Sequence, residues 1–255
     1  MMSTRAALTA ALWTMVVATQ AVASEQSKLL YSRGLVEVHA ENDAKALELF
    51  DAAVEADPSD VVARYYRGVA RGRQGDLEGA IADFEAALAR RSGFPRASLE
   101  LGAALLRVER FPEAAERFAE ARVDPELEAK ATLFEGIARL RLGDLDAARE
   151  LFEQARADEG QRQAVTFYEG VAAYQNGRMI EARGLLERVV AFGDGPMAVE
   201  AQALLDQMEP PAPALDLRAS AGFQYDSNVL LAPSDGEVLD DLLVSDEGDG
   251  SAIFA

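Results

Sequence analysis

The 255-residue sequence contains no cysteine, one histidine, one tryptophan and only 25 basic residues against 44 acidic ones. The absence of cysteine excludes disulfides, thiol catalysis, cysteine-ligated zinc or iron–sulfur sites and a lipidated N-terminal cysteine. The net charge of −19 argues against nucleic-acid binding, because that function needs basic surface to neutralise phosphates. With 49% apolar and 27% charged residues, the composition is that of a globular protein.

Few residues could support chemistry. His39 is the lone imidazole, and the sequence contains no serine nucleophile elbow and no glycine-rich phosphate loop. The acidic run at 235–249 lacks the ligand and glycine spacing of an EF-hand, and a charge run is usually just solvated. We therefore expect a binding protein rather than an enzyme, with no metal and no cofactor.

The N-terminus has the pattern of a secretory signal. Arg5 is the only charge before Glu25, the uncharged stretch 6–24 has an apolar centre, and Ala21-Val22-Ala23 precedes Ser24. A positive start, a short apolar centre and an A-x-A site predict a signal peptide at 1–23, cleaved after Ala23. An uncleaved membrane anchor is the alternative, but threonines and many alanines make the stretch weakly apolar. We expect an exported protein, in the periplasm or associated with the outer membrane.

The middle of the chain repeats every 34 residues. Each repeat carries a glycine, an alanine twelve residues later and a large apolar residue four further on. The glycines are Gly34, Gly68, Gly102, Gly136 and Gly170; the alanines are Ala46, Ala80, Ala114, Ala148 and Ala182; the large residues are Phe50, Phe84, Phe118, Phe152 and Leu186. Such a fixed period is the signature of a repeat architecture.

The spacing within one repeat predicts two packed helices. The alanine and the large residue lie four apart and share one helical face, whereas the glycine belongs to an earlier helix. Antiparallel helices about 8–10 Å apart need a small residue at the contact, and the large side chain fills the remaining gap. Gly75-Asp76 and Gly143-Asp144 fall where a first helix ends and a second begins. Pro112 suits the first turn of its helix.

This pattern resembles the tetratricopeptide repeat family, which has a small residue at position 8, alanine at 20, a large apolar residue at 24 and alanine at 27. The resemblance implies an all-α, right-handed α-solenoid spanning 24–209, with five helix pairs at 27–60, 61–94, 95–128, 129–162 and 163–196 and a capping helix at 197–209. The family's tryptophan at position 4 is replaced by Leu30, Arg64, Ser98, Thr132 and Thr166, and its tyrosine at position 11 by Glu37, Arg71, Leu105, Arg139 and Ala173.

The resemblance also implies a concave face lined by the first helices. The residues of this sequence at the lining positions include Lys28, Tyr31, His39, Tyr65, Arg73, Arg96, Arg107, Lys130, Arg141 and Phe167. A ladder of cations there would suit an extended acidic peptide of a protein partner, or an anionic polymer, because arginine pairs with carboxylates. The alternative is that the cations at position 13 only complement the C-terminal ends of their helices.

The C-terminal segment 210–255 changes character. A proline-rich linker is followed at 215–226 by strict alternation of apolar and polar residues, which is typical of a β-strand. Gly222–Val229 resembles the opening strand of outer-membrane barrels that follow periplasmic tetratricopeptide domains, as in surface lipoprotein assembly modifiers and polysaccharide-export porins. A barrel needs about eight strands. The segment is thus part of a longer protein, a strand that pairs elsewhere, or an acidic tail without a membrane role.

Two functional hypotheses remain from the sequence. In the first, the chain is the periplasmic, N-terminal part of an outer-membrane export or assembly protein that captures cargo in its groove. In the second, it is a free periplasmic scaffold or adaptor that binds protein partners and has no membrane role.

Overall fold

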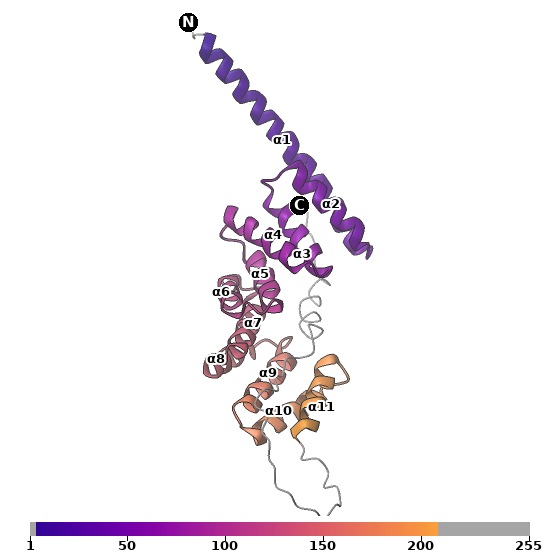
Figure 1. Cartoon of the computed structure of the whole chain (residues 1–255), viewed down its shortest axis with the longest axis vertical. Helices are drawn as coiled ribbons and strands as arrows, with labels where there is room; N and C mark the ends of the chain where they lie inside the picture. Colours follow the sequence, from indigo (N-terminus) through magenta and orange to yellow (C-terminus); the bar gives the residue numbers. More distant parts are fainter. Residues whose placement is uncertain (1–3, 209–255) are drawn as a thin grey trace, which may run out of the picture. The chain divides into compact units, whose positions relative to one another are not determined.

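The computed structural model of the protein describes residues 4–208, which form eleven α-helices and no strand (Figure 1). The strand predicted at 215–226 lies outside these residues. The helices are α1 (Thr4–His39), α2 (Asp43–Ala56), α3 (Val61–Arg73), α4 (Leu77–Arg90), α5 (Pro95–Arg107), α6 (Phe111–Ala121), α7 (Glu128–Arg141), α8 (Leu145–Ala155), α9 (Arg162–Gln175), α10 (Met179–Ala191) and α11 (Pro196–Met208). The predicted all-α class, with five helix pairs and a closing helix, is confirmed.

Helix boundaries follow from local turn chemistry. Asp76 is the N-cap of α4 and its side chain accepts a hydrogen bond from the Gly79 N–H, which satisfies one of the free amides of the first turn. Asp144 caps α8 in the same way. Gly75 and Gly143 precede these caps with φ of 84° and 79°, a conformation that glycine adopts without steric cost.

The two helices of a repeat meet at the glycine. A Cβ atom added to Gly102 would lie 2.7 Å from Cε1 of Phe118, so only a glycine permits this approach. Phe118 and Ala114 are fully buried. The same contact joins the glycine and the phenylalanine of the first, second and fourth repeats. In the fifth repeat, Leu186 replaces the ring, and the nearest atom to a Cβ on Gly170 lies at 3.0 Å.

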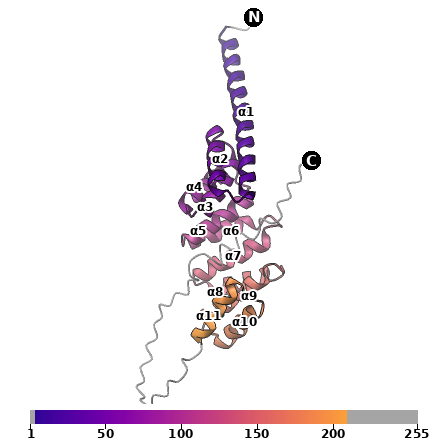
Figure 2. The ribbon, with the colours of Figure 1, turned by 90° about the vertical axis from the view of Figure 1, so that its right-hand side faces the viewer.

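The chain divides into two compact units after Ala131, within α7. In the first unit, α1 to α6 contact one another in sequence order; in the second, α8 contacts α9, and α10 contacts both α9 and α11. The first helix is much longer than its partner, and its N-terminal part extends beyond α2 (Figures 1 and 2). It passes without a break through the predicted cleavage site after Ala23. Of the helices described, none has the length and apolar composition needed to cross a membrane.

Candidate functional site

Predicted groove residues of the first unit come together where three first helices meet. Helix α3 contacts both α1 and α5. Tyr31 of α1 stacks on Tyr66 of α3 with ring centroids 6.0 Å apart, and Tyr65 meets Phe94, the residue before α5, at 5.1 Å. We call the surface formed by Tyr31, Tyr65, Arg73 and Arg96 the first-helix face.

Two cations of the first-helix face act on Tyr65. Burial raises the pKa of the Tyr65 hydroxyl and the negative charge of Glu100 adds to that rise, whereas the positive charges of Arg96 and Arg73 act in the opposite direction. Charges exert such an effect only when they lie close to the titrating group. Both arginines are exposed, and Arg96 forms a rim ion pair with Glu126 at 3.7 Å. This face therefore combines half-buried aromatic rings with accessible positive charge.

Three other predicted residues of this unit, Lys28, His39 and Arg107, lie at helix ends or on the exposed surface. Lys28 is exposed and pairs with Glu25 at 3.0 Å. His39 is exposed in the last turn of α1. Arg107 donates from Nη1 to the Gly72 carbonyl at 3.3 Å, in the last turn of α3. A cation on a C-terminal carbonyl is favourable without any ligand, and this carbonyl belongs to α3, the neighbour of the helix that carries Arg107.

The remaining predicted residues are more enclosed. Lys130 is 8% exposed and Phe167 is 2% exposed, with its ring edge-to-face against Tyr168 at 5.1 Å. Arg141 is half-buried. Burial raises the pKa of Tyr168, and the charge of Arg141 opposes that rise, which places the guanidinium near this phenol.

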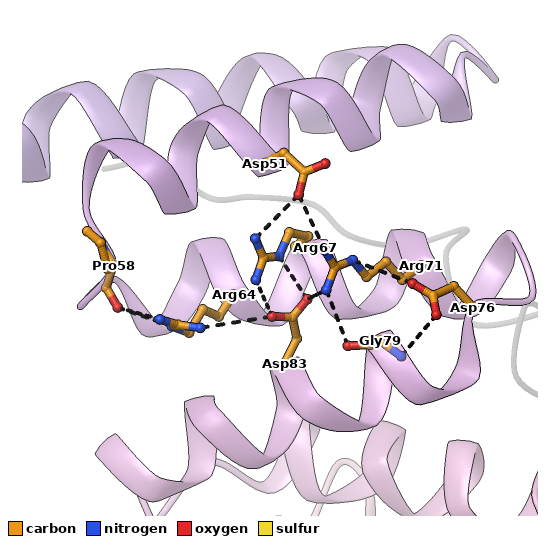
Figure 3. A network of polar contacts seen from close by, with 8 residues as sticks. All are labelled: Asp51, Pro58, Arg64, Arg67, Arg71, Asp76, Gly79 and Asp83. Atoms are coloured by element: carbon orange, nitrogen blue, oxygen red, sulfur yellow. Dashed lines mark hydrogen bonds and ion pairs between the residues drawn. The ribbon is translucent and has the colours of Figure 1, made fainter.

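A network of arginines and aspartates joins α2, α3 and α4, and no sequence pattern described above pointed to it (Figure 3). Arg64, Arg67 and Arg71 follow one another at intervals of three and four residues on α3 and so share a face. Arg64 and Arg71 hold the positions where the family has tryptophan and tyrosine. This spacing of arginines, opposite an aspartate at position 23 of the same repeat, is the signal that could have revealed the network.

Asp83 is at the centre of the network, with a side chain only 3% exposed. Arg67 donates from Nε and Nη2 to its two oxygens, at 2.8 and 2.5 Å, and Arg71 Nη1 donates to Oδ2 at 2.9 Å. Asp51 of α2 lies 3.3 Å from Arg67 Nη1. The hydrogen bonds to Asp83 raise the pKa of Arg67. Since these guanidiniums already have carboxylate partners, the network joins three helices and leaves no open site there.

Arg67, in the network, holds a repeat position that lines two cavities further along the chain. Each second-helix groove, as we call these two cavities, lies between the second helices of two consecutive repeats, over the first helix that separates them. Leu101 and Glu169 stand 34 and 102 residues after Arg67 and lie in the floors of the two grooves. Their side chains differ in chemistry, so the two grooves differ in what they can bind.

The groove between α4 and α6, over α5, is apolar and acidic. Leu101 and Leu105 form its buried floor, and Glu85, Glu113 and Glu120 stand at its rim around a cavity of about 350 Å³. The groove between α8 and α10, over α9, encloses about 440 Å³. We call it the α8–α10 groove; its charged lining residues are Arg149, Glu153, Arg156, Glu169, Arg178, Glu181 and Arg188.

No cluster of histidine and acidic side chains suited to a metal ion occurs between residues 4 and 208. The polar groups of the first-helix face and of the grooves can make ion pairs and hydrogen bonds. The first-helix face and the grooves are therefore suited to binding a partner through these contacts.

Comparisons with known proteins agree with the helix-pair architecture. The sequence profile of the tetratricopeptide repeat matches residues 15–61, 65–131 and 133–196, which together are well over half of the chain. None of the curated protein sequences is similar enough to the chain to count as a match.

Several solved structures share the fold. PilF of Pseudomonas aeruginosa is 20% identical, with a TM-score of 0.58, over 72% of this chain and 86% of its own. PilW, described as a widely conserved type IV pilus biogenesis factor, is 18% identical with a TM-score of 0.58, over 71% and 92%. YrrB, described as a repeat protein with an unusual peptide-binding site, is 20% identical with a TM-score of 0.59, over 68% and 90%. From its sequence profile and its helix pairs, the chain belongs to the tetratricopeptide repeat family.

Proposed function

We propose that this protein is an exported capture module, whose first-helix face binds an extended acidic segment of a cargo protein. The observation that carries the proposal is the meeting of Tyr65, Arg73 and Arg96 from two adjacent first helices. Aromatic rings provide rigid contact area at low entropic cost, and arginines pair with carboxylates in a defined geometry. A chain of tetratricopeptide repeats is a protein-interaction module, so the family membership supports a role in binding.

The proposed compartment is the periplasm, where the protein would form the N-terminal part of an outer-membrane export or assembly system. The signal-like residues 1–23 and the alternating residues 215–226 support this assignment. PilW, which has the same fold, is described as a pilus biogenesis factor.

The location is tested by expressing the full chain in a Gram-negative host, then fractionating the cells and determining the N-terminal residue by mass spectrometry. We expect a mature N-terminus at Ser24 and recovery with the outer membrane. Recovery only in the soluble periplasmic fraction would favour the free scaffold instead. An intact N-terminus on cytoplasmic protein would contradict export altogether.

Capture is tested with a fluorescent peptide of Asp-Glu-Gly repeats and its Asn-Gln-Gly counterpart, by fluorescence anisotropy. Because Arg73 and Arg96 are exposed, the double variant R73Q/R96Q should fold normally and bind the acidic peptide at least about tenfold more weakly. R33Q/R90Q removes the same charge from exposed positions elsewhere and is the matched control. If R73Q/R96Q and R33Q/R90Q bind the acidic peptide with equal affinity, the first-helix face is not the binding surface.

A further inference from the structure

The α8–α10 groove gathers polar atoms that lack partners. Four arginines and three glutamates line it. Two of the four buried side-chain atoms without a hydrogen-bond partner in the described part of the chain belong to these residues, Oε2 of Glu169 and Nε of Arg178. Buried polar atoms are nearly always paired, so two such atoms in one groove call for an explanation.

Glu169 lies in the floor of the groove with a side chain only 8% exposed. Arg156 Nη2 donates to one carboxylate oxygen, Oε1. The other oxygen, Oε2, accepts no hydrogen bond from any residue between 4 and 208. A hydrogen bond from any N–H or O–H donor that reaches this oxygen is therefore stabilising, because it satisfies a buried acceptor.

Arg178 stands at the N-cap of α10 and bonds through Nη1 to Glu181 at 3.0 Å, whereas its buried Nε has no acceptor. The third repeat provides a comparison, because Arg110 stands at the same repeat position, at the N-cap of α6. There, both Nε, at 2.7 Å, and Nη2 donate to Glu113. The repeat position therefore permits full pairing, and the open Nε is particular to the α8–α10 groove.

Arg149 of α8 and Arg188 of α10 also line the groove and are exposed, and neither forms an ion pair within the described part of the chain. Leu185, which also lines the groove, holds the repeat position of Asp83, the carboxylate that pairs with Arg67 and Arg71 in the second repeat. The α8–α10 groove therefore has no carboxylate at that position.

We propose that the α8–α10 groove binds an acidic peptide segment through Arg149 and Arg188, while the peptide backbone satisfies Glu169 and Arg178. A carboxylate of the peptide pairs with the two unpaired guanidiniums, an amide N–H donates to Glu169 Oε2, and a carbonyl accepts from Arg178 Nε. The ligand must therefore supply a hydrogen-bond donor beside its negative charge, which a fully ionised anion such as acetate or sulfate lacks. The cavity of about 440 Å³ is within the range of ligand pockets.

The inference goes beyond the proposed function, because it places a second binding site in the second unit, built from other residues than the first-helix face. Ile180, which lines the groove and is 93% exposed, offers apolar contact beside the charged groups. The site requires no particular compartment, so it does not depend on export.

The test uses the full chain and the same Asp-Glu-Gly and Asn-Gln-Gly peptides. The substitutions are made in the R73Q/R96Q background, so that binding at the first-helix face does not mask the groove. There we expect R149Q/R188Q to weaken the remaining affinity for the acidic peptide at least about tenfold, since charge-assisted hydrogen bonds are lost, whereas R33Q/R90Q should change it less than about twofold. Acetate and sulfate should compete poorly, because at neutral pH neither carries a hydrogen-bond donor for Glu169. If R149Q/R188Q and R33Q/R90Q lower the affinity to the same extent, the attraction is non-specific and the proposal is overturned.

A photocrosslinking amino acid at the position of Ile180 reports on the groove directly, and one at Val199, which is exposed on α11, is the control. The acidic peptide should crosslink at 180 and not at 199, and should still do so in R73Q/R96Q. If it crosslinks at 180 while R73Q/R96Q has no effect on affinity, the groove is supported and the first-helix face fails. If R73Q/R96Q abolishes binding and position 180 never crosslinks, the groove fails and the proposed function stands.

Discussion

Arg67 holds both carboxylate oxygens of Asp83, with Nε 2.8 Å from Oδ2 and Nη2 2.5 Å from Oδ1. This fork-to-fork geometry is the strongest form of the arginine–carboxylate pair. The carboxylate is buried, and a buried charge is tolerated only when it is paired and hydrogen-bonded. The pair thus ties α3 to α4 at a position where other repeats of the chain use apolar side chains, such as Leu151 and Leu185.

Replacing Asp83 should destabilise the protein strongly. Asp83→Ala leaves Arg67 and Arg71 partly buried without their main counter-charge, and breaking a buried pair from one side costs about 3–5 kcal/mol. Asp51→Ala is the control, because Asp51 is 44% exposed and should contribute less than about 1 kcal/mol. Guanidinium chloride unfolding measures both, and equal losses would contradict the central place of Asp83.

Removing both partners should cost less than removing one. In R67L/D83L an apolar contact takes the place of the ion pair, and such replacements are often neutral. We expect this variant to be more stable than Asp83→Ala by guanidinium chloride unfolding. A double variant less stable than Asp83→Ala would mean that Arg67 contributes through Asp51 or through packing rather than through Asp83.

The helix pairs were predictable from the sequence because each depends on residues at fixed separations within one repeat. Gly102 and Phe118 lie 16 residues apart in every copy of the pattern, as do Gly136 and Phe152. The grooves combine residues of two repeats, such as Arg156 with Glu169, and the pairing differs from groove to groove. A periodic pattern cannot reveal a contact that does not recur. The contacts of Asp83 with Arg64, Arg67 and Arg71 were missed for that reason. The substitutions at Arg64 and Arg71 mark the loss of family residues, but they do not identify Asp83 as the new partner.

Glycine-to-alanine substitutions at two helical positions, Gly102 and Gly184, should change the stability of the protein in opposite directions. In Gly102→Ala the new methyl group meets the buried Phe118 ring at 2.7 Å, and overpacking of this kind costs about 1–3 kcal/mol. Gly184 of α10 has no heavy atom within 4 Å of its Cβ position, so Gly184→Ala should stabilise by about 0.5–1 kcal/mol through helix propensity. Thermal unfolding compares the two. If Gly102→Ala were as stable as the unaltered protein, the close approach of the Phe118 ring to Gly102 would be contradicted.

The cost of Gly102→Ala should fall when Phe118 is also changed. The fifth repeat has leucine opposite its glycine, and there the nearest approach to an added Cβ is wider, 3.0 Å against 2.7 Å. In a double-mutant cycle, Phe118→Leu should therefore reduce the penalty of Gly102→Ala, with a coupling energy of about 0.5–3 kcal/mol. Phe118→Ala is the reference for loss of the buried ring and should cost about 3–5 kcal/mol. Strict additivity of Gly102→Ala and Phe118→Leu would show that the two side chains do not compete for space.

Acid should weaken the Arg110–Glu113 contact. Hydrogen bonds from Arg110 lower the pKa of Glu113 from its usual value near 4.5. A carboxyl whose folded pKa is depressed adds stability above its unfolded pKa, and that stability is lost as the pH falls through the folded value. Arg110→Gln should therefore have a slightly lower Tm than the unaltered protein at pH 6, and the difference should shrink below about pH 4.5.

The effect should be small because both side chains are about half exposed and solvent screens the pair. Arg188→Gln is the control, since Arg188 makes no ion pair within the described part of the chain, and its Tm difference should show no such trend with pH. Thermal scans from pH 7 to pH 3 in low salt measure both variants. A Tm difference for Arg110→Gln that stays constant, or grows, as Glu113 becomes protonated would contradict a contact based on the ionised carboxylate.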